Sequence, residues 1–161
     1  MSSGMKNSRT YVLAAFLSVL AMRAAEGQRL PIAISPAKRT ALGETPVAVP
    51  LKSQNRAAAI DAEHCYIVIE GLTADRPVGT GYEVSIAGRA GAEDRQTAIG
   101  SLSFYNAIGL SPAQSGPASF EVPSSYCAAA NKGKIIVTIA PDRQPVAGSN
   151  PLIGVVKLIA Q

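Results

Sequence analysis

The stretch HCYIVIEGLTADRPVGTGYEVSIAGRAGAEDRQTAIGSLSFYN, residues 64–106, decides the fold because strand patterns alternate in it with turn residues. Its first segment, residues 65–70, is rich in β-branched side chains, which favour a strand over a helix. Successive residues of a strand point to opposite faces. We therefore expect one face to carry Cys65, Ile67 and Ile69, and the other Tyr66, Val68 and Glu70.

The rest of this stretch predicts two more strands. Every second residue of 82–87 is a large apolar one, which is typical of a half-buried strand. A polar, glycine-containing loop at residues 88–96 leads to a third strand at residues 97–105. Within that strand Ile99 is out of phase with the apolar residues that follow it. A β-bulge at Gly100 would absorb this slip of one residue.

Five further segments outside this stretch have strand patterns: residues 30–35, 46–51, 118–122, 134–140 and 152–160. The segment 134–140 is the most hydrophobic, and we expect it to be central in a sheet. Proline cannot donate to a ladder. Pro31 therefore restricts its strand to an edge or to the strand's own first residues, and Pro50 indicates a second edge strand.

Helical signals are weak by comparison. Residues 52–62 fit a turn of helix or a loop equally well, and residues 124–132 fit a helical turn. About eight short strands separated by turn signals indicate an all-β fold. We expect an antiparallel β-sandwich or a jelly-roll-like barrel.

The amino-terminal segment, residues 1–27, has the pattern of a signal peptide. Basic residues precede an apolar run at 11–21, and small residues at 25 and 27 form a cleavage pattern. The alternative is a retained anchor, but the run is shorter than the roughly 20 residues that span a bilayer. We expect cleavage after Gly27, a periplasmic or secreted mature protein, and no stable membrane insertion.

The charge balance argues against a nucleic-acid partner. Residues 1–27 contain three basic residues and one acidic residue, so their removal lowers the formal net charge from +4 to +2. The remainder has no cluster of Lys and Arg, and too few aromatic residues for a base-stacking platform.

Cys65 and Cys127 are the only cysteines of the chain. An even count in an exported protein predicts one disulfide between them. It would close a loop of roughly 60 residues and contribute on the order of 4 kcal/mol by the chain-entropy estimate. The alternative is a reactive or metal-binding thiol, but neither cysteine has basic or histidine-rich neighbours that would lower its pKa.

The single histidine, His64, excludes most metal chemistry. A di-copper centre needs several imidazoles, a blue-copper site needs two, and a structural zinc site needs about four ligands. No G-x-S-x-G motif accompanies His64, so a serine-hydrolase triad has no support. We expect a surface histidine, with no catalytic, metal-binding or cofactor-binding residues and no cofactor.

The acidic residues do not form a cluster in the sequence. They are scattered along the predicted strands and loops, at Glu70, Glu83, Glu93, Asp94 and Glu121. Weak Ca²⁺ binding by the neighbouring pair Glu93 and Asp94 stays open as an alternative. From the residues alone, the chain is expected not to be an enzyme.

The order of several motifs resembles the non-catalytic carboxy-terminal β domain of bacterial tyrosinases and plant polyphenol oxidases. In that family a strand ending in glycine is followed by "PG-x-x-Y-E-V" and "G-x-L-x-F" strands, and later by "F-D-V", "V-T-h-V-P" and closing strands. The corresponding segments here are YIVIEG at 66–71, PVGTGYEV at 77–84, IGSLSFY at 99–105, FEV at 120–122, IVTIAP at 136–141 and IGVVKL at 153–158.

The resemblance covers roughly residues 60–161, which we take as the β domain. Residues 28–59 are then an amino-terminal extension with edge strands. In the family this domain is a β-sandwich packed over the entrance to a di-copper site, and it is implicated in latency and maturation. The copper-binding domain with its histidines does not occur in this sequence, so the resemblance implies fold and kinship but not phenol oxidation. A residue that blocks the copper site in the family lies on a loop, and residues 105–117 are the candidate here.

Two functions follow as hypotheses. In the first, the protein is a secreted, non-catalytic accessory domain that caps or assists a separate di-copper phenol oxidase. In the second, it is a free-standing extracellular structural or adhesive β-sandwich with no link to copper. A third interpretation, an enzyme with an unrecognised site, would require phenol oxidation by the chain itself in the presence of Cu²⁺.

Overall fold

The computed structural model describes residues 31–54, 64–88, 96–130, 132 and 135–160. Their elements, in chain order, are β1 Pro31–Ile34, β2 Thr40–Ala41, β3 Val47–Ser53, β4 Cys65–Ile69, β5 Tyr82–Gly88, β6 Gln96–Leu102, η2 Tyr105–Ala107, β7 Ala118–Val122, α2 Ser124–Ala130, β8 Ile135–Pro141, β9 Leu152–Ile153 and β10 Val156–Ala160. Each predicted strand has a counterpart, so the predicted all-β fold is confirmed.

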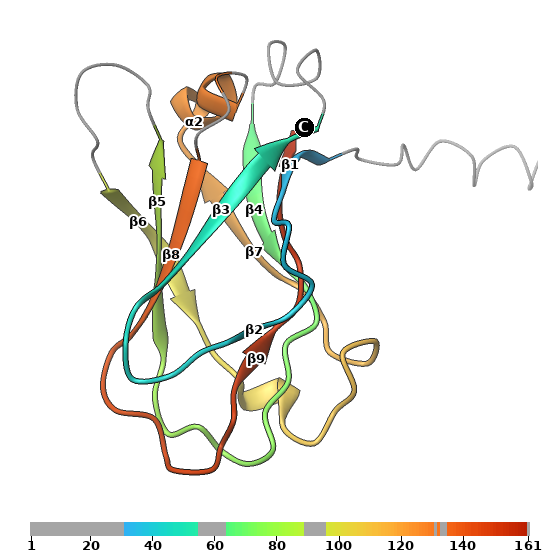
Figure 1. The fold of residues 1–161 in the computed structure, drawn as a ribbon, viewed down its shortest axis with the longest axis vertical. Helices are drawn as coiled ribbons and strands as arrows, with labels where there is room; N and C mark the ends of the chain where they lie inside the picture. Colours follow the sequence, from blue (N-terminus) through green and yellow to red (C-terminus); the bar gives the residue numbers. More distant parts are fainter. Residues whose placement is uncertain (1–30, 55–63, 89–95, 131, 133–134, 161) are drawn as a thin grey trace, which may run out of the picture.

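Eight of the strands form one antiparallel sheet in the order β6-β5-β8-β3-β1-β10-β4-β7, and β2 pairs with β9 beside it (Figure 1). The sheet bends round on itself, so its two outer strands come close together. The aromatic ring of Phe120 in β7 lies directly against Gly100 in β6. The architecture is therefore a nearly closed sandwich, which agrees with the predicted sandwich or barrel.

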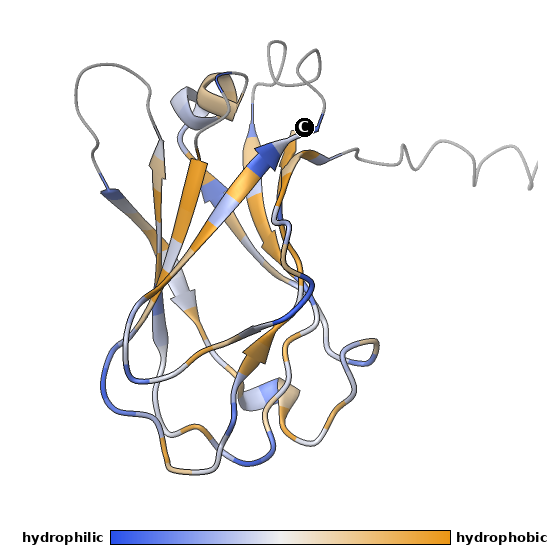
Figure 2. Ribbon diagram, in the orientation of Figure 1, coloured by the Kyte–Doolittle hydropathy of each residue, from blue (hydrophilic) through white to orange (hydrophobic). Residues whose placement is uncertain are grey.

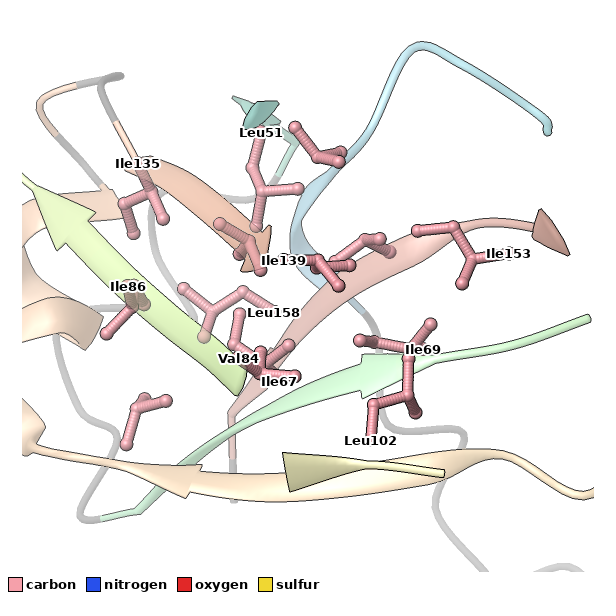
Figure 3. Packing of buried hydrophobic residues seen from close by; sticks show 14 of the residues in the cluster. Leu51, Ile67, Ile69, Val84, Ile86, Leu102, Ile135, Ile139, Ile153 and Leu158 are labelled. Carbon is pink, nitrogen blue, oxygen red and sulfur yellow. The ribbon is translucent and has the colours of Figure 1, made fainter. Parts of the chain in front are cut away.

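The core lies between the two halves of this bent sheet. In β4 the alternation is as predicted: Cys65, Ile67 and Ile69 are fully buried, while the residues between them are partly exposed. Strand β8 contributes Ile135, Val137 and Ile139 in the same way, and Figure 3 shows side chains from both halves meeting in one cluster. Apolar residues concentrate along the strands, whereas hydrophilic residues gather in the connecting loops (Figure 2).

The predicted bulge is present between β5 and β6. Val84 pairs with Gly100 and the next residue, Ser85, pairs with Ala98, so Ile99 is the extra residue of the bulged strand. The extra residue brings the later apolar side chains of β6 back to the buried face, so Leu102 lies in the core. The expectation that the segment 134–140 is central is also confirmed, because β8 has a partner on each side, β5 and β3.

The prediction of an edge strand at Pro50 was wrong, whereas of the two options predicted for Pro31 the structure shows the second. Strands β1 and β3 both lie inside the sheet, although Pro31 does occupy the first position of β1, the other option that its sequence left open. Strand β3 tolerates Pro50 because β1 pairs with β3 only at Lys52 and Ser53. One side of β3 is therefore free of ladder pairing at Pro50, so a residue without an N–H is tolerated at this position of an inner strand.

Two details were missed by the sequence patterns. The predicted closing strand 152–160 is divided into β9 and β10 at Gly154, whose N–H donates to the carbonyl oxygen of Glu70 at 2.8 Å. A Cβ at Gly154 would lie 2.7 Å from that same oxygen, so only glycine allows this close approach. The two-residue strand β2 has too short a pattern to be recognised.

The predicted helical turn near residue 124 is the helix α2, Ser124–Ala130. The predicted signal peptide (residues 1–27), the segment 55–63 and the loop 89–95 lie outside the described residues. No helix in the described part of the chain is long and apolar enough to cross a membrane.

Candidate functional site

The predicted disulfide is present. The sulfur atoms of Cys65 and Cys127 are 2.07 Å apart and both residues are buried. The bond joins the start of β4 to α2, at the end of the sandwich where β1 begins and β10 ends. Since both cysteines of the chain are paired, the alternative of a reactive or metal-binding thiol does not hold in this structure.

His64 is an exposed residue beside this disulfide, as the sequence indicates. Its Nδ1 lies 3.1 Å from Oε1 of Glu121, and both side chains are mostly exposed. Cys65 points the other way, into the core. Among the described residues there is no group of three or more His, Cys, Asp or Glu side chains that could hold a metal ion.

Of the acidic residues named in the sequence analysis, Glu70 follows β4, Glu83 lies on β5 and Glu121 lies on β7. The carboxylate of Glu70 binds the ammonium group of Lys157 at 2.7 Å, across the β4–β10 ladder, and Glu83 is exposed on β5. Glu93 and Asp94, the pair considered for Ca²⁺, lie outside the described residues.

The opposite end of the sandwich carries the more distinctive surface, which we call the loop end. It is built by the three connections 71–81, 103–117 and 142–151, together with η2 (Figure 1). Backbone hydrogen bonds tie these connections together: the N–H of Gly109 donates to the carbonyl oxygen of Ala74 at 2.9 Å, and the N–H of Val146 to that of Val78 at 2.8 Å. The loop end is therefore an ordered surface rather than three independent loops.

A hollow of about 360 Å³ opens at the loop end. Its apolar walls include Val78, Phe104 and Ile108, and its rim includes Tyr105 and Arg143. Phe104 is also part of the core, where its ring meets that of Tyr82 edge to face at 5.7 Å. A second hollow of about 190 Å³ is lined by Asn106 and Ala107 of η2 and by Gly116 and Pro117.

The loop end also exposes large apolar side chains. Tyr105 is 82% exposed, Val146 49% and Leu110 38%. The fourth exposed large apolar residue of the described chain, Ile136, lies elsewhere, on the outer face of β8. A phenol ring this exposed on a short, hydrogen-bonded turn is a good candidate for a contact with a partner.

The sequence found only part of this site. Residues 105–117 were selected from the family resemblance, and Tyr105 is the first of them. Val78, Val146 and Arg143 were missed, because they come from segments far apart in the chain and no local pattern marks them as neighbours.

One buried polar group in the described chain has no partner. Tyr82 is fully buried, and its hydroxyl makes no hydrogen bond. Desolvation by burial raises the pKa of the Tyr82 phenol above its ordinary value. The ring is therefore held as the neutral phenol at physiological pH.

Comparison with known proteins adds little to this geometry. No protein-family model matches the chain, and no curated protein matches it. Among solved structures, the chain is similar to the CBM22-1–GH10 modules of the N-terminal endo-1,4-β-D-xylanase 10B of Clostridium thermocellum, crystallised with xylohexaose. The identity is 11% and the TM-score 0.40, over 83% of this chain and 27% of that one, and a likeness this low carries no argument.

Proposed function

We propose that this protein is an exported, non-catalytic accessory domain that docks its loop end onto a separate di-copper phenol oxidase. The observation that carries the proposal is the position of Tyr105. It presents an 82% exposed phenol ring, and it begins the segment 105–117, the candidate for the loop that faces the copper site in tyrosinase carboxy-terminal domains.

The surface around Tyr105 supports a protein contact. Val146 and Leu110 add exposed apolar area at the same end, and polar residues such as Arg143 and Asn106 stand around it. Aromatic residues in apolar surroundings with a polar rim dominate the binding energy of many interfaces. The described chain begins with β1 and ends with β10, both at the opposite end of the sandwich.

The proposal gives the chain no oxidase activity of its own. It carries one histidine, whose partner is a carboxylate, whereas a di-copper centre needs several imidazoles. Purified protein supplied with Cu²⁺ should therefore not oxidise a phenol, and turnover above that of free Cu²⁺ would defeat the proposal.

The docking test compares two matched variants, Tyr105→Ala and Ile136→Ala. Both remove an exposed apolar side chain, but only Tyr105 lies at the loop end. With a di-copper phenol oxidase encoded by the same genome, we expect Tyr105→Ala to weaken binding by about thirtyfold or more, as for an interface hot spot of about 2 kcal/mol. Ile136→Ala should bind like the wild type.

The outcome also separates the two hypotheses. If the wild-type chain binds no such oxidase, or if the two variants bind equally well, docking through the loop end is refuted. A free-standing structural or adhesive sandwich would then be the better explanation.

A further inference from the structure

We propose that the hollow beside Tyr105 is a binding site for a small aromatic carboxylate. The inference goes beyond the proposed function and does not depend on it, because the hollow belongs to the chain alone. Its volume of about 360 Å³ lies at the small end of the roughly 300–1,000 Å³ range of ligand pockets. A single substituted ring fits a space of this size.

The walls of the hollow favour a ligand with a flat apolar ring. Phe104 is almost fully buried, and its edge-to-face contact with Tyr82 anchors it in the core. Val78 is equally buried, and Ile108 closes another side. Tyr105 adds an exposed ring at the rim, against which an aromatic ligand can pack offset or edge to face.

Arg143 supplies the charge that selects an anion. Arg143 lines the hollow and is an exposed residue. The ion pairs within the described part of the chain, His64 with Glu121 and Lys157 with Glu70, lie elsewhere. An unpaired guanidinium offers a planar fork of donors that matches a carboxylate.

The site is already assembled without a ligand. The N–H of Arg143 donates to Oγ1 of Thr80 at 3.2 Å, and the N–H of Asp142 to the carbonyl oxygen of Gly81 at 3.0 Å. With the bond from Val146 to Val78, these contacts hold the 142–146 segment against the opposite wall. A preformed site loses little conformational entropy on binding.

The carboxylate of Asp142 should repel a bound anion. Its carboxylate faces Gly81, since a Cβ at Gly81 would lie 2.6 Å from Oδ2 of Asp142. Gly81 lines the hollow, so this negative charge stands near the expected carboxylate. Removal of the charge in Asp142→Asn should therefore tighten binding, in the opposite direction to the loss expected at Arg143.

The test is an NMR titration of the isotopically labelled chain with three probes. Benzoate has the ring and the charge, benzyl alcohol keeps the ring alone, and acetate keeps the charge alone. We expect benzoate to shift amide signals of 78–81 and 103–108, with a dissociation constant on the order of 1 mM, as for a fragment of this size. The other two probes should bind at least about tenfold more weakly.

Two arginine variants provide the matched control. Arg143→Gln should weaken benzoate binding by about tenfold or more. Arg76→Gln should leave it unchanged, because the Arg76 guanidinium lies against Gly148 and does not line the hollow. The absence of shifts at about 50 mM benzoate, equal binding of benzyl alcohol, or equal effects of the two variants would each overturn the proposal. Failure of oxidase docking would not affect this result, because the titration uses the chain alone.

Discussion

Removal of the Cys65–Cys127 disulfide should cost a large share of the domain's stability. The two cysteines are 62 positions apart, and a cross-link over a loop of this length restricts the unfolded chain by about 4 kcal/mol. Typical domains have about 5–15 kcal/mol in total. We therefore expect the double variant Cys65→Ala/Cys127→Ala to fold marginally or to lose roughly this amount of unfolding free energy.

The assay is urea unfolding of the oxidised protein, the reduced protein and the double variant. Reduced wild-type protein is the essential control, because it keeps both buried sulfur atoms and loses only the link. With m-values of about 1–3 kcal/mol/M, the urea midpoint of the reduced protein should fall by at least about 1 M. The urea midpoint of the double variant should fall slightly further, because this variant also loses the buried sulfur atoms.

The structure also predicts where the reduced protein opens first. The link holds α2 against β4, at the end of the sandwich remote from η2. Amide hydrogens of α2 should therefore lose more exchange protection on reduction than those of β8, which is paired on both sides. Oxidised and reduced proteins with unfolding free energies within about 1 kcal/mol of each other would refute the chain-entropy reasoning.

Two further predictions concern single residues. Gly100→Ala should destabilise the domain by about 1–3 kcal/mol, because the new Cβ would lie 2.5 Å from Cδ1 of Phe120. Gly116→Ala has open space and serves as the control in urea unfolding, and equal losses would contradict the close approach of β6 and β7. Tyr82→Phe should leave stability at neutral pH unchanged or raise it by about 1 kcal/mol, because the buried hydroxyl has no partner. Burial raises the pKa of Tyr82 above 10.0, so the wild type should lose stability above about pH 10, where the unfolded chain ionises first, and Tyr82→Phe should lose less in alkaline unfolding experiments.

Most of the fold was predictable because its signals are local. The alternation in β4 and β5 grouped the apolar residues that the structure buries on one face of each strand, although Ser85 on the other face of β5 is buried too. The phase slip at Ile99 predicted the bulge opposite Val84. The pairing of the only two cysteines was likewise predictable from their number. These features depend on side-chain period, turn chemistry and residue count, which are properties of short segments.

The strand order was not predictable from such signals. Pro50 suggested an edge strand. Its place in an inner strand is tolerated because β1 pairs with β3 only beyond Pro50, and no local sequence pattern shows how far that pairing extends. Gly100 appeared only as a bulge residue, yet the structure also requires it to leave space for Phe120 from the far edge of the sheet. The roles of both residues depend on contacts between distant segments.

The sequence by itself determined an all-β chain with one disulfide and too few imidazoles for a copper centre, because these follow from period and composition. Only the tertiary structure decided that Tyr105 projects from the loop end beside a hollow, with Val78 on one side and Arg143 on another. The physical reason is that the bent sheet brings three separate connections to one end, where backbone hydrogen bonds join them. A surface assembled in this way has no signature in any single stretch of the chain.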